Sequence, residues 1–257
     1  MTGTFTPMPG AATLPRMVLT QARMESRLML RNGEQLLIAV VIPVIVLVGL
    51  VGAADSLGLD YDDPVVDVVT PGVLALAVLS TSFTSLAIAT GFERRYGVLK
   101  RLGTSPLPRS GLLAGKILAL LLVELLQVAV IAVVGVLLGW DPSPGPAGLV
   151  GAVLAASLGT AAFASLGLLV AGSLRAEATL AVANLVYLLL LAGGAVVLPA
   201  AAYGGFGDVA TWLPSGALGE AMRDALLHGD IAWRDLAVLL GWGAVGSVLA
   251  ARTFSWE

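Results

Sequence analysis

The sequence predicts an all-α integral membrane protein with six transmembrane helices. The chain has 257 residues, of which 58% are hydrophobic and 12% are charged, about half the charged share of soluble domains. Apolar stretches of about 20 residues, the length that a bilayer-spanning helix needs, recur along the chain. The alternation of apolar and polar residues that is typical of transmembrane barrels is absent. The lack of cysteine excludes disulfides, thiolate metal sites and cysteine nucleophiles.

The N-terminal region precedes the first span. Residues 1–14 are rich in Thr, Pro, Gly and Ala, which predicts a flexible tail. Residues 15–34 carry four arginines among apolar residues, so we expect an amphipathic helix along the inner membrane face. A basic flank of the first span is the alternative interpretation.

The transmembrane domain is predicted to cover residues 35–257. A loop with five aspartates and no basic residue separates its first two spans. The pair Asp62-Asp63 suggests a metal or diphosphate site, but no second acidic cluster has ligand spacing, so an exposed loop without metal is favoured. The six spans are predicted at about 35–54, 69–90, 112–139, 148–173, 179–198 and 235–251.

Polar residues inside three of these spans are candidates for a substrate path. The second span has a series of hydroxyls, and the third places a glutamate and a glutamine three residues apart on one helical face. An ionisable residue at this depth is a functional hypothesis by default, although helix packing through hydrogen bonds explains these residues equally well. The candidates are Ser80, Thr81, Thr84, Ser85, Glu124, Gln127, Asn184 and Tyr187.

Residues 199–234 are too interrupted by Gly, Pro and acidic residues to form a span. A helical spacing of apolar residues after Pro214 predicts a short helix that dips into the outer leaflet. We therefore expect an extracellular re-entrant helical segment. His228 has no partner at metal-ligand spacing, which favours an exposed loop histidine.

Charge is divided unequally between the two predicted sides. The side that holds both termini has twelve basic and five acidic residues, and the opposite side has two basic and eleven acidic residues. Positively charged loops face the cytoplasm, so both termini are predicted to be cytoplasmic.

The loop 91–111 lies on this cytoplasmic side. The stretch from Gly91 to Lys116 holds six of the fourteen Lys and Arg residues, and it combines a short amphipathic helical pattern with a Thr-Ser-Pro-Leu-Pro break. A simple tether does not need this pattern, so we predict a docking element for a cytoplasmic partner. A basic face that binds lipid headgroups is the alternative.

Catalytic motifs are missing. The sequence contains no GxxxxGK[ST] loop, no GxSxG elbow and no HExxH pair, and it has a single histidine. The chain is therefore not predicted to be an enzyme, and its energy source is expected on another protein. Nothing in it points to a nucleic-acid partner.

The run Glu93–Leu102, followed by Thr104–Leu107 and Gly115-Lys116, resembles the cytoplasmic loop of type-2 ABC exporter permeases, approximately E+xxGxL+xLxxSPLxxxxxxxGK. The C-terminal third also looks like the extracellular re-entrant region of this family. One departure is the segment AVVLP after Gly194, which lacks the aromatic residues often found there. The resemblance implies gate residues at Gly193, Gly194, Pro199, Pro214 and Arg223.

The resemblance implies a permease subunit in the plasma membrane of a prokaryote. It would pair with itself or a related permease, bind no cofactor, and dock a separate ATPase that holds ATP and Mg²⁺. Its cargo would be a drug, as in multidrug efflux, a lipid or a lipid-linked glycan. A membrane-embedded lipid-modifying enzyme and a non-transporting sensor or assembly subunit are the alternatives. The implied coupling residues are Glu93, Arg94, Arg95, Gly97, Leu99, Lys100, Arg101, Leu102, Pro106 and Leu107.

Overall fold

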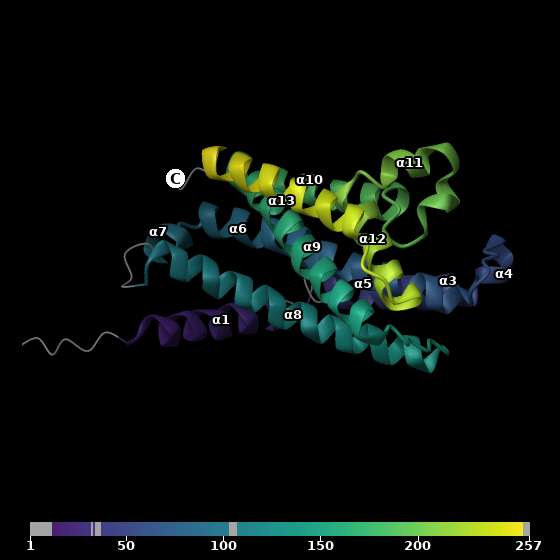
Figure 1. Ribbon diagram of the computed structural model, residues 1–257. Coiled ribbons are helices and arrows are strands. Elements are labelled where there is room, and N and C mark those ends of the chain that lie inside the picture. Colours follow the sequence, from purple (N-terminus) through teal and green to yellow (C-terminus); the bar gives the residue numbers. More distant parts are fainter. Residues whose placement is uncertain (1–11, 32, 34–36, 103–106, 254–257) are drawn as a thin grey trace, which may run out of the picture.

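The computed structural model describes residues 12–31, 33, 37–102 and 107–253, and all regular secondary structure in these ranges is helical (Figure 1). Five described segments are long and apolar enough to cross a membrane: Val65–Arg95, Ser110–Leu137, Gly145–Ser173, Ala176–Gly193 and Trp233–Thr253. A shorter apolar stretch, Ala39–Gly52, occupies the place of the first predicted span. The predicted all-α architecture is confirmed, and these apolar helices are compatible with a membrane protein. A count of six spans requires the short stretch to cross as well.

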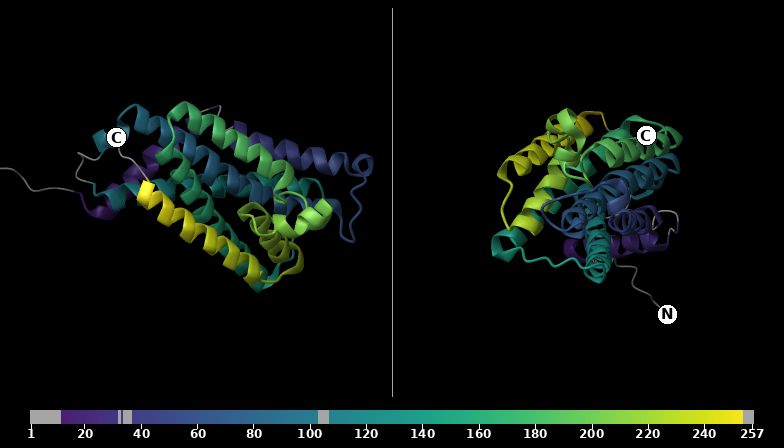
Figure 2. Two further views of the ribbon diagram at one scale, coloured as in Figure 1. Left: turned by 90° about the horizontal axis from the view of Figure 1, so that it is seen from above. Right: turned by 90° about the vertical axis from the view of Figure 1, so that its right-hand side faces the viewer.

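A continuous helical rod forms the centre of the bundle. It consists of α5 (Val65–Leu79), the π-helix η2 (Ser80–Ser85) and α6 (Leu86–Arg95). The α5 part of the rod is apolar on all sides, which is typical of a buried helix. In the most apolar 18-residue stretch of the rod, 89% is buried. Seen from one end, other helices surround it (Figure 2, right). They are α3 (Ile42–Gly52), α8 (Arg109–Leu137), α9 (Gly145–Ser173), α10 (Ala176–Gly193) and α12 (Pro214–Arg223), with α13 (Trp233–Thr253) packed on α9 and α12.

Glycines on α9 allow its backbone to approach its neighbours closely. A Cβ atom on Gly167 would lie 2.9 Å from the carbonyl oxygen of Phe83 in η2. A Cβ atom on Gly159 would lie 2.7 Å from Leu218 Cδ1 on α12. Small residues permit such packing between membrane helices, where burial of apolar surface supplies little driving force.

One end of the bundle carries α1 (Leu14–Arg31), α7 (Val98–Leu102) and the end of α13 (Figure 1). α1 packs against the start of α8 through a polar face that includes Gln21 and Glu25, and Gly115 provides the space for this contact. Its arginines are exposed. A helix, Leu14–Arg31, overlaps most of the range 15–34 in which an amphipathic helix was expected. Its position along a membrane face stays a prediction. The predicted tail falls mostly on residues 1–11, outside the described ranges.

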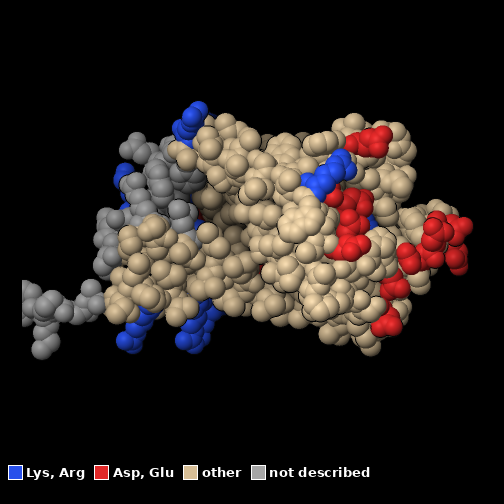
Figure 3. All heavy atoms as spheres, in the orientation of Figure 1, with Lys and Arg blue, Asp and Glu red and all other residues tan. Residues whose placement is uncertain are grey.

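The opposite end carries α4 (Ala54–Leu57), the 3₁₀ helix η3 (Ala200–Phe206), α11 (Gly207–Ala210) and η4 (Asp224–His228). Lys and Arg gather mainly at the α7 end and Asp and Glu at this end (Figure 3), so we call them the basic end and the acidic end. A short helix does begin at Pro214, as predicted, but α12 is buried against α5, α9 and α13. The helix predicted at about 179–198 corresponds to α10, which ends at Gly193, before the predicted residue 198. The carbonyls of the following residues, Ala195–Leu198, bind the side chain of Arg223 instead of continuing the helix.

Candidate functional site

An ion cluster joins three helices at the basic end. The ammonium of Lys116 on α8 lies 2.7 Å from Glu93 Oε1 on α6 and 3.1 Å from Glu25 Oε1 on α1. Gln21 Nε2 also donates to Glu25 Oε1, at 2.9 Å. We call Glu25, Glu93 and Lys116 the inner ion cluster. Since its side chains are mostly buried, a change in one helix alters the electrostatic environment of the other two.

Two arginines bind the end of α6 to further helices. The guanidinium of Arg94 donates to the carbonyl oxygens of Ala171 (2.9 Å), Gly172 and Leu174 (2.8 Å) at the C-terminus of α9. These carbonyls lack partners within the helix, and the negative end of the helix dipole favours a cation there. Arg95 pairs with Glu177 in the first turn of α10. Three consecutive residues of α6 therefore bind three different helices: Glu93 binds α8, Arg94 binds α9 and Arg95 binds α10.

The segment that follows is exposed. Gly97 adopts φ +66°, a left-handed conformation that glycine accepts without strain, and it separates α6 from α7. Tyr96, Val98 and Lys100 are exposed, with Tyr96 at 64% of its maximum. α7 is therefore a short basic helix at the surface, next to an α6 end that is held firmly.

A buried carboxylate lies midway along α8. Glu124 Oε1 accepts from Ser82 Oγ of η2 at 2.7 Å, and Oε2 accepts from Thr160 Oγ1 of α9 at 2.8 Å. The residue is 6% exposed. Within the described residues it forms no ion pair, and its two side-chain hydrogen bonds come from hydroxyl groups. Glu124 thus links the central rod to α8 and α9, and none of the described cations pairs with it.

Gln127 extends this network toward the first apolar stretch. Its Oε1 accepts from Thr81 Oγ1 at 2.7 Å, and its Nε2 donates to the carbonyl of Ala39 in η1 (Leu37–Val41). Asn184 and Tyr187 lie on α10, and in the described part of the chain no hydrogen bond joins them to Glu124 or Gln127. The predicted pair Glu124 and Gln127 therefore forms one network with η2, and the α10 pair does not.

A cavity of about 450 Å³ opens beside this network between α6, α8, α9 and α13. Lys116 lines it near the basic end and Thr160 lines it deeper in the bundle. The hollow is visible left of centre on the face drawn in Figure 3. Thr160 connects this cavity to Glu124, because it both lines the cavity and donates a hydrogen bond to that carboxylate.

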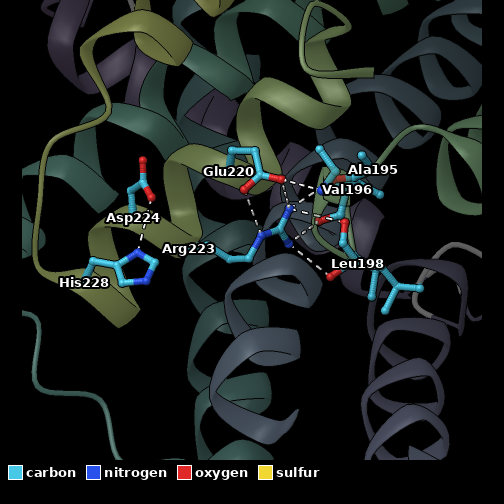
Figure 4. Close-up of polar contacts among 9 residues, drawn as sticks. Ala195, Val196, Leu198, Glu220, Arg223, Asp224 and His228 are labelled. Atoms are coloured by element: carbon cyan, nitrogen blue, oxygen red, sulfur yellow. Dashed lines mark hydrogen bonds and ion pairs between the residues drawn. The ribbon is translucent and has the colours of Figure 1, made fainter. Parts of the chain in front are cut away.

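Arg223 organises the acidic end (Figure 4). The residue is 3% exposed, and its guanidinium donates to the carbonyl oxygens of four successive residues, Ala195–Leu198, at 3.1–3.3 Å. It also binds Glu220 Oε1 at 3.0 Å, and this oxygen accepts from the backbone N–H of Ala200 at 2.7 Å. We call Arg223, Glu220 and these four carbonyls the outer clamp. It holds the backbone that leaves α10 against α12.

The outer clamp also contacts the central rod. A Cβ atom on Gly72 of α5 would lie 2.3 Å from the Val197 carbonyl oxygen and 2.8 Å from Arg223 Nη1. Burial raises the pKa of Tyr61 and of Tyr203, and the positive charge of Arg223 opposes both shifts. Both phenols therefore stay neutral at physiological pH, and Arg223 keeps Glu220 as its charged partner.

Comparison with known proteins decides the family. The model of a family described as "ABC-2 family transporter protein" matches residues 61–252. The chain belongs to this ABC-2 transporter family. The matched region contains the central rod, α7, the Glu124 network and the outer clamp. A search of curated proteins finds no match. As an ABC-2 permease, the chain is a membrane component of a transporter and not a catalytic one, and the family works with an ABC ATPase.

The residues predicted for coupling in this ABC-2 permease divide into two groups. Glu93, Arg94 and Arg95 bind other parts of the same chain, whereas the resemblance had implied contacts of all three with the ATPase. The remaining described residues lie on or beside α7: Lys100 and Arg101 are exposed, Gly97 and Leu102 are half-buried, and Leu107 is buried. The side chain of Leu99 and all of Pro106 lie outside the described parts.

The predicted hydroxyls of the second span, Ser80, Thr81, Thr84 and Ser85, all lie buried in η2. The structure also adds residues that the sequence analysis missed, namely Glu25, Thr160 and Glu220. Each had a weak signal: Glu25 is an acid among arginines, Thr160 is polar within a Gly- and Ala-rich span, and Glu220 lies three residues before Arg223 on one helical face. Among the predicted gate residues, Arg223 binds the four carbonyls that lie between Gly194 and Pro199. The role of these residues as a gate stays a prediction.

Proposed function

We propose that this ABC-2 permease forms half of a translocation path, in a dimer with itself or a related permease. A separate cytoplasmic ATPase, which binds ATP and Mg²⁺, drives the export of a hydrophobic or amphiphilic compound. The observation that carries the proposal is the exposed helix α7 directly after an α6 end that is bonded to three other helices. Such an element suits the transfer of force from a partner into the bundle.

The bonds at the end of α6 support this role. Each joins an ionised side chain to a carboxylate or to helix carbonyls, and charge-assisted hydrogen bonds are shorter and stronger than neutral ones. Glu93 reaches α8, Arg94 reaches α9 and Arg95 reaches α10. A displacement of α7 would therefore move the inner ends of three apolar helices together.

The proposed orientation places the basic end in the cytoplasm of a prokaryotic cell. Lys and Arg gather there and Asp and Glu gather at the other end, which supports a positive-inside arrangement (Figure 3). An ATPase in the cytoplasm would then meet α7. The outer clamp would lie outside the cell, where it would close the path.

The variant Val98→Asp tests the docking role. Val98 is on α7 and partly exposed, so an aspartate should fold there but would be desolvated in a protein interface. An unpaired buried charge costs several kcal/mol, so we expect at least a tenfold loss of stimulated ATP hydrolysis in the complex with its ATPase. Membrane insertion should stay normal.

Arg252→Glu is the matched control, because Arg252 is exposed at the same end of the bundle on α13. It should leave ATP hydrolysis unchanged. Normal stimulated hydrolysis by the Val98→Asp complex would contradict the docking role. ATP-dependent uptake into inverted vesicles by the wild-type complex separates a transporter from a sensor or assembly subunit, which would show none.

A further inference from the structure

The cavity between α8 and α9 has the size and the lining of a ligand site. Its volume of about 450 Å³ lies within the roughly 300–1,000 Å³ that is typical of small-molecule pockets. Ile117 and Leu121 on its wall are 51% and 42% exposed, so the cavity is open on the apolar side of the bundle. A hydrophobic compound dissolved in the bilayer could enter it without passing through water.

Two hydroxyl groups on the wall can act as acceptors, and Lys116, Ser157 and Ser247 also line the cavity. Thr160 donates its hydroxyl proton to Glu124, and Ser165 donates its proton to the carbonyl of Ala162 at 2.8 Å. Each hydroxyl oxygen keeps lone pairs, so both groups can accept a hydrogen bond from a ligand in the cavity. The ammonium of Lys116 already binds two carboxylates, Glu93 and Glu25.

Charged groups lie on and near the cavity wall. Lys116 is the charged residue on the wall itself. With its partners Glu25 and Glu93 it forms the inner ion cluster, whose formal net charge is −1. About 12 Å farther along α8, by helical rise, Glu124 is buried without an ion pair among the described residues. A buried ionised carboxylate with no counter-ion is costly, so a cation bound nearby would stabilise the charged form of Glu124.

We propose that this cavity binds a lipophilic cation, such as a protonated hydrophobic amine. The cationic group lies against Thr160, one side chain from the Glu124 carboxylate, and the apolar part lies against Ile117 and Leu121. Binding concerns this chain alone. Only the further step, that such cations are the exported cargo, rests on the proposed function.

The test is equilibrium binding of radiolabelled tetraphenylphosphonium to the purified chain in detergent, without an ATPase. We expect saturable binding that Glu124→Gln weakens about tenfold or more, because a low-dielectric charge pair of at least 1.4 kcal/mol is lost. Asp63→Asn, which removes a carboxylate from the exposed outer loop, should not change it. Decylammonium should displace the probe better than decanol, and decanoate should compete least.

A second variant protects the test from a folding defect in Glu124→Gln. Ala161 lines the cavity and is exposed, so Ala161→Phe should fill the space without overpacking the core and should also abolish binding. Unchanged binding in both variants, or competition by decanoate equal to that of decylammonium, would overturn the inference. Cation binding without ATP-driven transport would instead overturn the proposed function alone. ATP-driven export of another compound by a chain that binds no tetraphenylphosphonium would overturn this inference alone.

Discussion

Replacing Arg223 by methionine tests whether the outer clamp holds the acidic end together. Methionine keeps an unbranched apolar side chain and removes every hydrogen-bond donor. The carbonyls of Ala195 and Val196 would lose their donor where both residues are 0% exposed, and Val197 is only 3% exposed. Water cannot replace the guanidinium without opening the segment. We therefore expect Arg223→Met to destabilise the contact between α12 and the backbone after α10.

The magnitude follows from the number of buried acceptors. One unsatisfied buried acceptor costs about 1–3 kcal/mol, and removing one partner of a buried charge pair costs about 3–5 kcal/mol. Several carbonyls share the donors of Arg223, so their costs do not add fully. A local loss of about 3–5 kcal/mol corresponds to a 100- to several-thousand-fold increase in the opening equilibrium.

Hydrogen exchange measured by mass spectrometry checks this expectation. Peptides over residues 190–205 and α12 should exchange faster in Arg223→Met, while peptides from the middle of α9 should not. Arg223→Lys should give an intermediate effect, since an ammonium cannot reproduce the planar fork of a guanidinium.

Arg234→Met is the matched control at the same end. Arg234 is on an exposed surface, where its Cζ lies 5.0 Å from the centre of the Trp212 ring and its Nη2 donates to Thr211 Oγ1 at 3.1 Å. Replacing it should therefore lower stability by about 1 kcal/mol or less. Unchanged exchange in Arg223→Met, or an equal acceleration in Arg234→Met, would refute the reasoning.

Two further substitutions test other contacts through the melting temperature of the purified chain. Lys116→Met leaves two carboxylates of the inner ion cluster without their cation and should cost about 3–5 kcal/mol; adding Glu93→Gln should restore part of the stability, and no restoration would argue against charge repulsion. Gly72→Val would place a Cβ atom 2.3 Å from the Val197 carbonyl oxygen, so it should lower the free energy of unfolding by about 3 kcal/mol. Gly49→Val on α3 is the control, because a Cβ atom there would have nothing within 4 Å, and it should be nearly neutral. Equal melting temperatures for the two glycine variants would contradict the close approach of α5 to the outer clamp.

The sequence predicted the apolar helices well because hydropathy over about 20 residues is a strong local signal. It missed the end of the fifth helix, at Gly193, for a physical reason. The apolar run continues to Leu198, so hydropathy alone extends the helix. What ends it is Arg223, 25 to 28 residues later, which binds the carbonyls of Ala195–Leu198. A side chain so distant in sequence leaves no mark on a local pattern.

The candidate site shows the same limit. The depth and the spacing of Glu124 and Gln127 identified them as polar residues on one face, and both do bond to η2. The second donor to Glu124, Thr160, is 36 residues away and could not be chosen from sequence. The loop motif likewise identified Glu93 but could not predict which way its side chain points. Only the fold shows that it turns to Lys116 instead of toward solvent.

The central rod connects the contacts at both ends of the molecule. Its outer part meets the outer clamp at Gly72, and its inner end carries the bonds of Glu93 and Arg94. Between them lies η2, a π-helix, whose wider turns are less regular than those of an α-helix and often occur at functional sites. The Ser82 hydroxyl in this segment binds Glu124 beside the cavity. A displacement at α7 and a charge bound near Thr160 therefore act on the same rod. Within the proposed function, this shared element is what would let cargo binding and ATPase movement influence one another, because each biases the position of a single buried helix.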